Sequence, residues 1–325
     1  MDYINYVKEY PLQGLTGLWG GTTGALVGGT APEPDPGETE YYGGRAILTI
    51  EGEHINYWSI ENSSTNASHF GECSQTHVDK NSCAASAEGR AVWAGGNSDP
   101  GEMMYLSTSS TGNGNDFGNM TMGRYAPVGS SNGVRMGIAT GTAPGGAGNT
   151  DNIEYITVAT TGNGTNFGDS LVSRHGRDTI SGGARMIMAN GQDPYTDTID
   201  YISLSTTGNA TDFGDTTIAR TFGSGGNTDP GSGQNRGLFI CGIPFQQSGD
   251  YITCDTTSNA TDWGELLQGY YYRMGCGTNG SRVFAAGGTG GGNEITYQNV
   301  DTINSCTAGG DITHSGDAMG TSGPS

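Results

Sequence analysis

The sequence predicts an all-β fold, a β-propeller of about six four-stranded blades, with five to seven possible. Three observations predict it: a motif that recurs at a near-constant interval, short segments rich in β-branched and aromatic residues, and glycine-rich turns between them. Glycine makes up 59 of the 325 residues, more than twice the usual share of about 7%. Disordered chains lack aromatic residues, whereas here 16 Tyr, 8 Phe and 4 Trp recur at fixed spacing, which indicates strands and turns.

Two markers fix the register of the repeat. One is an arginine that opens a short apolar segment. From the first of these arginines, Arg45, to the last, Arg282, there are five intervals over 237 residues, so the mean repeat length is near 47 residues. This period lies within the roughly 40–50 residues of a propeller blade. The other is a tyrosine followed twelve residues later by an aromatic residue and glycine, as in Tyr155 and Phe167. The arginines are Arg45, Arg90, Arg135, Arg185, Arg236 and Arg282, and the later aromatic residues are Phe117, Phe167, Phe213 and Trp263.

Each repeat is expected to hold four short strands. Residues 90–96 and 153–159 give the first two, and residues 166–169 and 172–174 give the third and fourth. Ile153 and Ile156 mark opposite faces of the second strand, and both faces are apolar, which suits a sheet packed between two neighbours. A closed ring of blades leaves few exposed strand edges. An open β-solenoid is the alternative architecture, although its rungs are usually shorter.

The ends of the chain extend this division. Residues 1–29 form an N-terminal arm, either an anchor or a partial blade, and residues 30–40 are an acidic, proline-rich linker. Residues 41–325 form the propeller. Its sixth repeat is irregular, and we expect the N-terminal side to supply the missing strand and so close the ring.

Charge and composition exclude several classes of partner. With 13 basic and 33 acidic residues the net charge is −20, which repels phosphate and argues against nucleic-acid binding. No apolar run approaches the roughly 20 residues that span a bilayer, and no signal-type start is present, so we expect no membrane partner and synthesis in a reducing cytoplasm. The six cysteines contain no Cys-x-x-Cys pair, so no metal site is expected. Cys73 and Cys83 could form a disulfide within one repeat, although such bonds are rare in the cytosol. Cys254 occupies an apolar repeat position and is expected in the core.

The repeated arginines allow two interpretations. If their strand lies nearest the axis, six guanidinium groups line a central channel and bind an anion. Otherwise each one pairs with an acidic group or with carbonyl groups of its own or the next blade, which their recurrence favours. A second repeated arginine lies seven residues after the repeat aromatic residue. An acidic residue lies two residues after the same aromatic residue in several repeats, and we expect the arginine and the acid to form an ion pair. The arginines are Arg124, Arg174 and Arg220, and the acids are Glu72, Asp169, Asp215 and Glu265.

Candidate contact residues are those outside the repeat. Tyr270, Tyr271 and Tyr272 form a cluster found in no other repeat and are the predicted site for glycan or protein contact. The repeated aromatic residues could stack on glycans, but their recurrence favours packing between blades. Variable loops near residues 97–100, 192–197 and 227–230 are expected on one face.

Catalytic and metal-binding features are weak in this sequence. Asp193 and Asp197 could hold calcium, but without EF-hand spacing. The five histidines occupy different repeat positions and no Gly-x-Ser-x-Gly elbow occurs, so we expect a non-enzymatic protein without a cofactor. Asn163, Asn209 and Asn259 have the form of glycosylation sites but are more simply turn residues.

The repeated phrase Tyr-Ile-Thr … Thr-Thr-Gly-Asn-Ala-Thr-Asp-Phe-Gly-Asp, with Arg-Gly-Leu-Phe before it, resembles kelch-like proteins of tailed bacteriophages, especially those of marine bacteria, over residues 45–290. The resemblance implies a virion protein of the tail, fibre or capsid surface, in which residues 1–29 contact other virion proteins. Kelch units place a tryptophan about six residues after their tyrosine, whereas this chain places its aromatic residue twelve after, so galactose-oxidase-type chemistry is not implied. The alternatives are a carbohydrate-binding module that contacts host-surface glycan and a glycan hydrolase that uses face carboxylates.

Overall fold

The computed structural model describes residues 44–50, 53–62, 64–73, 83–87, 89–96, 100–227, 235–244, 246–270, 274–288 and 292–323. The predictions for the arm, residues 1–29, and for the linker, residues 30–40, lie outside these residues. No helix in the described part of the chain is long and apolar enough to cross a membrane. Its helical content is one short 3-10 turn, Pro144–Gly146.

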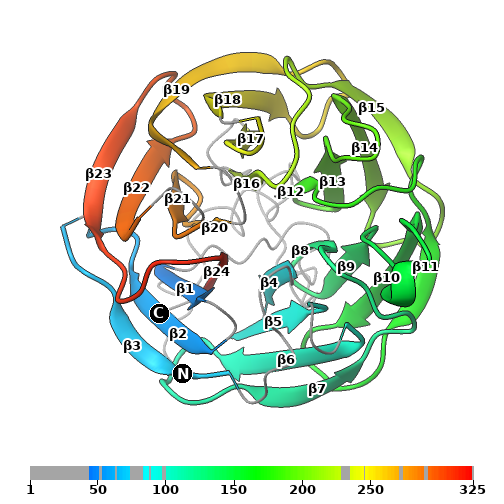
Figure 1. Ribbon diagram of the computed structural model, residues 1–325, viewed down its shortest axis with the longest axis horizontal. Coiled ribbons are helices and arrows are strands. Elements are labelled where there is room, and N and C mark those ends of the chain that lie inside the picture. Colours follow the sequence, from blue (N-terminus) through cyan, green and yellow to red (C-terminus); the bar gives the residue numbers. More distant parts are fainter. Residues whose placement is uncertain are drawn as a thin grey trace, which may run out of the picture. The chain divides into compact units, whose positions relative to one another are not determined.

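Six four-stranded antiparallel sheets form a six-blade ring, which confirms the predicted fold class (Figure 1). In each blade one strand lies at the hub and the fourth lies at the rim. From hub to rim, blade 1 is β24 (Ala318–Gly323), β1 (Arg45–Ile50), β2 (His54–Ser59) and β3 (Ser68–Glu72); blade 2 is β4 (Cys83–Ala87), β5 (Arg90–Ala94), β6 (Glu102–Ser107) and β7 (Asn115–Asn119); blade 3 is β8 (Val128–Ser131), β9 (Arg135–Ala139), β10 (Asn152–Thr157) and β11 (Thr165–Asp169). Blade 4 is β12 (Asp178–Gly182), β13 (Arg185–Ala189), β14 (Thr198–Ser203) and β15 (Thr211–Asp215); blade 5 is β16 (Ser224–Asn227), β17 (Arg236–Ile240), β18 (Gln246–Thr253) and β19 (Thr261–Tyr270); blade 6 is β20 (Gly275–Thr278), β21 (Arg282–Ala286), β22 (Glu294–Asn299) and β23 (Cys306–Asp311).

The ring is closed by its last strand, and the prediction for this closure was wrong. β24 pairs antiparallel with β1, with Gly323 opposite Arg45 and Ala318 opposite Ile50. The C-terminal side therefore completes the first blade, whereas we expected the N-terminal side to complete the sixth repeat. The reason is that the strand before each arginine strand is the hub strand of the same blade. The predicted strand at residues 172–174 is likewise absent, and the next strand is β12.

The hub strands are rich in glycine, alanine and serine, because neighbouring blades approach one another closely there. A Cβ atom on Gly225 would lie 2.8 Å from the carbonyl oxygen of Thr179, and one on Gly320 would lie 3.0 Å from the Cys276 nitrogen. Hydroxyl groups also join adjacent hub strands, since Ser181 donates to the Ser131 carbonyl at 2.6 Å. Small side chains at the hub therefore allow six sheets to meet.

The apolar core lies between blades. Each of the six hydrophobic clusters draws side chains from two adjacent blades. In blade 3, Ile156 packs toward blade 2 and Ile153 packs toward blade 4, which confirms that both faces of this strand are buried. The repeated aromatic residues belong to these clusters and are at most 4% exposed, as the packing interpretation requires. They are Phe117, Phe167, Phe213 and Trp263.

Candidate functional site at the joints between blades

The two faces of the ring carry different connections. We call one side of the ring the turn face. It carries the hairpins between the first and second strands of each blade, such as residues 132–134, and the turns between the third and fourth strands, such as residues 158–164. The loop face is the opposite side, where residues 140–151 join β9 to β10 and residues 120–127 lead from blade 2 to blade 3. The variable loops do not share one face as expected, since residues 192–197 leave β13 on the loop face whereas Asn227 ends β16 on the turn face.

The repeated arginines tie neighbouring blades together on the turn face. Arg135 lies 4.6 Å above the ring centroid of Tyr155 in its own blade and donates to the Leu204 carbonyl of blade 4 at 3.1 Å. Arg45, Arg90, Arg185 and Arg236 stack and donate in the same way, to Thr108, Val158, Cys254 and Asp301. Their strand is second from the hub, so the condition for an anion-binding channel is not met, and the contacts are carbonyl contacts to the next blade.

Buried ion pairs link three joints on the loop face. Arg124, on the connection from blade 2 to blade 3, lies 2.5 Å from Glu154 of β10, and both side chains are 0% exposed. The second Glu154 oxygen accepts the Thr121 N–H at 2.6 Å. The next two joints repeat the arrangement with Arg177–Asp200 and Arg220–Asp250. An opposite charge and hydrogen bonds offset the cost of burying each group.

The predicted partners of these arginines were wrong. Asp169, for example, lies exposed on the outer strand of its blade. The chain crosses to the next blade before it reaches the arginine, so the guanidinium group meets the third strand of that next blade. Arg174 donates to the Asn190 carbonyl at 3.1 Å, and Arg177 forms the ion pair in its place. The acid directly before the repeat tyrosine, within an apolar strand, was the signal that would have identified the partner.

Asp178 is a buried acid that occurs in only one of the described hub strands. It begins β12 and is 1% exposed, at a position held by Val128 in blade 3 and Gly275 in blade 6. Asn190 donates to its Oδ2 at 2.6 Å. Burial raises the pKa of Asp178 to about 7, against the lowering effect of the Arg220 charge. Burial also lowers the pKa of Arg220 itself.

His175 lies on the loop face, on the connection from blade 3 to blade 4. Its Nδ1 is 3.0 Å from the Asn149 Oδ1 and 3.5 Å from the Asp193 Oδ2. The rings of Phe222 and Tyr125 lie 5.7 and 6.4 Å from it. Burial lowers the pKa of His175, and the Asp193 charge opposes this shift. Asp193, considered above for calcium with Asp197, thus contacts a histidine. Among the described residues no group of three or more His, Cys, Asp or Glu could hold a metal ion.

An asparagine clasp closes each joint at the rim. The Asn163 Oδ1 of blade 3 accepts the Asn119 N–H at the end of β7 at 3.0 Å. The neighbouring Gly162 and Gly164 N–H groups donate to carbonyls of β7, at 2.8 Å each. All six joints have this asparagine bond, with Asn66, Asn113, Asn163, Asn209, Asn259 and Asn304. The Asn-x-Ser/Thr triplets are therefore part of the clasp, and each turn covers the outer edge of the preceding blade.

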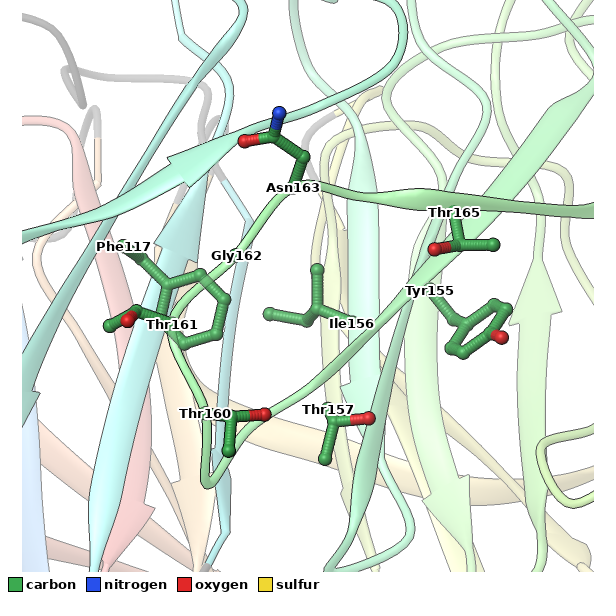
Figure 2. Close-up of a pocket in the computed structure, with 9 residues that line it drawn as sticks. All are labelled: Phe117, Tyr155, Ile156, Thr157, Thr160, Thr161, Gly162, Asn163 and Thr165. Atoms are coloured by element: carbon green, nitrogen blue, oxygen red, sulfur yellow. The ribbon is translucent and has the colours of Figure 1, made fainter.

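A pocket of about 190 Å³ opens at the joint between blades 2 and 3. Figure 2 shows Ile156 on the side of β10 that faces Phe117 of β7, whereas the Tyr155 ring points to the other side of the strand, where it packs against Phe167 in the cluster between blades 3 and 4. The remaining lining residues are polar or glycine and belong to the end of β10, the turn and β11: Thr157, Thr160, Thr161, Gly162, Asn163 and Thr165. No charged side chain lines the pocket. Sequence reasoning missed this site, because each of its residue types recurs in other repeats.

The remaining predicted sites differ in outcome. Tyr271 and Tyr272 lie outside the described residues, and of Tyr270 only the backbone is described, at the end of β19. Cys73 is a free, half-buried thiol, so the disulfide with Cys83 is not formed. Burial and the neighbouring Glu72 raise the pKa of Cys73 to about 12. Cys254 is buried in the core, as predicted. No protein-family model matches the chain, and no curated protein sequence matches it.

Proposed function

We propose that this protein is a non-enzymatic structural component of a tailed-phage particle, at the tail, fibre or capsid surface, that displays the propeller as a rigid scaffold. The phage origin rests on the resemblance of the repeated phrase to kelch-like phage proteins. The observation that carries the scaffold role is the double closure of the ring, at the hub by β24 and at the rim by Asn66 and Asp311. The recurring polar side chains bind neighbouring blades, which leaves the variable loops for contacts with partners.

Mass spectrometry and cryo-EM of purified particles of the encoding virus test this proposal. Presence at a defined symmetry supports it, and absence from purified particles overturns it. A chain that lacks residues 1–29 should keep a folded ring by circular dichroism and fail to enter particles. Normal incorporation of this shortened chain would contradict the proposed contact between the arm and other virion proteins.

Carbohydrate binding at the host surface is the second candidate function. The uncharged pocket at the joint between blades 2 and 3, lined mainly by threonine, glycine and asparagine residues, favours it. The tyrosine cluster is a separate proposed contact. Tyr271→Ala should weaken binding of the purified protein to host cells, and unchanged binding would remove that cluster from consideration.

A further inference from the structure

We propose that a patch on the loop face, at the joint between blades 3 and 4, binds a basic polypeptide segment that carries apolar side chains. The inference rests on the scaffold function proposed above, in which the loops contact partners, and it names the class of that partner. The patch combines exposed apolar residues with exposed acids, which are Leu171, Val172, Tyr195, Asp151, Asp193 and Asp197.

Two segments of the loop face lie side by side in this patch. One is the connection from blade 3 to blade 4, and the other is the loop that leads from β13 to β14 of blade 4. The His175 carbonyl accepts the Gln192 N–H at 3.1 Å, and the Leu171 N–H donates to the Asp200 Oδ2, also at 3.1 Å. The loop is thus fixed to the connection at both of its ends.

The apolar side chains of the patch are open to solvent. Leu171 is 47% exposed, Val172 is 42% exposed and Tyr195 is 51% exposed. They make up half of the six large apolar side chains that the described residues expose. A partner that covers them removes apolar surface from water, which is favourable in proportion to the area covered. Tyrosine is also among the residues that most often anchor a binding surface.

Leu171 departs from the repeat at its position. The corresponding residues of the two neighbouring joints are Thr121 and Thr217, which bond to the equivalent acids Glu154 and Asp250. The fold therefore does not require an apolar side chain here, and at this joint the leucine side chain is half exposed. A residue that breaks the repeat at an exposed position is better explained by a contact outside the chain than by packing.

The surface charge of the patch is negative. Asp151 and Asp197 are exposed, and the Asp193 side chain is 65% exposed. The Asp151 carbonyl accepts the Ser170 N–H at 2.7 Å, which places this acid beside the connection. The arginines on the loop face, within the described part of the chain, are at most 3% exposed and offer no surface charge to offset these acids: Arg124, Arg174, Arg177 and Arg220. The patch therefore attracts lysine and arginine side chains and repels anions.

The turn face lacks this combination. It carries the repeated arginines, which are only partly buried, so a basic partner is attracted less strongly there. The two ends of the described ring, Arg45 and Gly323, are also paired at the turn face. Neither of these ends joins the ring beside the patch, which leaves the patch open to a partner.

Fluorescence anisotropy of labelled octapeptides with the full-length protein tests the proposal. The probe is a peptide of alternating lysine and leucine. One control peptide has serine in place of leucine, and the other has glutamate in place of lysine. We expect a Kd on the order of 0.1 mM for the lysine–leucine peptide and roughly tenfold weaker binding of either control.

Variants locate the bound peptide. Leu171→Thr restores the residue of the neighbouring joints and should raise the Kd roughly three- to tenfold, because apolar contact is lost. Tyr195→Ser should raise it roughly tenfold. The double variant Asp151→Asn/Asp197→Asn should raise it roughly two- to fivefold at low salt and little at high salt. Ile303→Thr removes a side chain that is 50% exposed on the turn face; it is the matched control and should leave the Kd unchanged.

Four results would overturn the proposal. They are no binding of the lysine–leucine peptide, equally tight binding of the serine peptide, equally tight binding of the glutamate peptide, and an equal effect of Ile303→Thr and Leu171→Thr. Thermal unfolding of each variant confirms that the ring is folded. Incorporation into particles is measured separately, so a failed peptide test leaves the virion proposal in place, and absence from particles leaves the peptide result in place.

Discussion

Replacement of Asp178 by Asn should stabilise the ring at alkaline pH. Asp178 is almost fully buried at the hub, and its pKa is raised from 3.8 to about 7 by burial. The folded state therefore holds a proton that the unfolded chain releases at lower pH. This contribution to stability is complete below pH of about 4 and is lost as the pH rises through about 7. Asparagine keeps the acceptor for Asn190 and has no charge to bury.

The size of the effect follows from the shift. About three pKa units at 1.36 kcal/mol each give roughly 4 kcal/mol as an upper bound at pH 9. The nearby Arg220 and Arg177 charges lower the pKa of Asp178 and are already part of this shift. We therefore expect the variant to exceed the wild type by about 2–4 kcal/mol at pH 9, and by much less at pH 5.

Chemical denaturation at pH 5 and pH 9 measures this difference. The comparison of variant with wild type at each pH removes the contribution of the other titrating groups. Asp169→Asn, an exposed acid at the rim, is the control and should show no such change with pH. If Asp178→Asn is less stable than the wild type at pH 9, Asp178 is ionised and paired with Arg220, and the reasoning fails.

Three further predictions concern the contacts that hold the ring together. Glu154→Gln leaves Arg124 buried without its counter-charge and should lower the free energy of unfolding, measured by urea titration, by about 3–5 kcal/mol. The double variant Arg124→Met/Glu154→Leu should recover most of this loss. If it does not, the ion pair itself is stabilising. Asn209→Ala removes one rim bond and should cost about 0.5–1.5 kcal/mol, whereas a neutral result would mean that the backbone bonds of the turn suffice. Deletion of residues 318–325 exposes the edge of β1 and should convert a monodisperse protein into aggregates in light scattering; a monodisperse shortened chain would contradict the role of β24 in closure.

The period and the strand types were predictable because they depend on local residue patterns. Tyr155 and Phe167 mark strands in which β-branched and aromatic side chains dominate, and both were assigned correctly. The hub strands were missed since residues such as Gly225 and Gly226 have low strand propensity. They are strands because the neighbouring blades require small residues at the hub, which only the assembled ring reveals.

The contacts between blades were harder to predict than the blades themselves. Sequence proximity suggested that Arg124 pairs with an acid of its own repeat, whereas its partner Glu154 lies 30 residues further on. The direction in which the chain crosses between blades decides this, and it cannot be derived from a period.

The closure of the ring by β24 also sets an order of events during synthesis. Arg45 and Gly323 are paired across 278 residues, which a ribosome takes roughly 15–55 s to translate. Blades 2 to 6 are complete in sequence before the partner of β1 leaves the ribosome. Until then the inner edge of β1 is open, and a chain cut short before β24 never closes it. Closure of the ring therefore distinguishes a chain that includes β24 from a shortened one, because only a chain that includes β24 has a partner strand for the hub edge of β1.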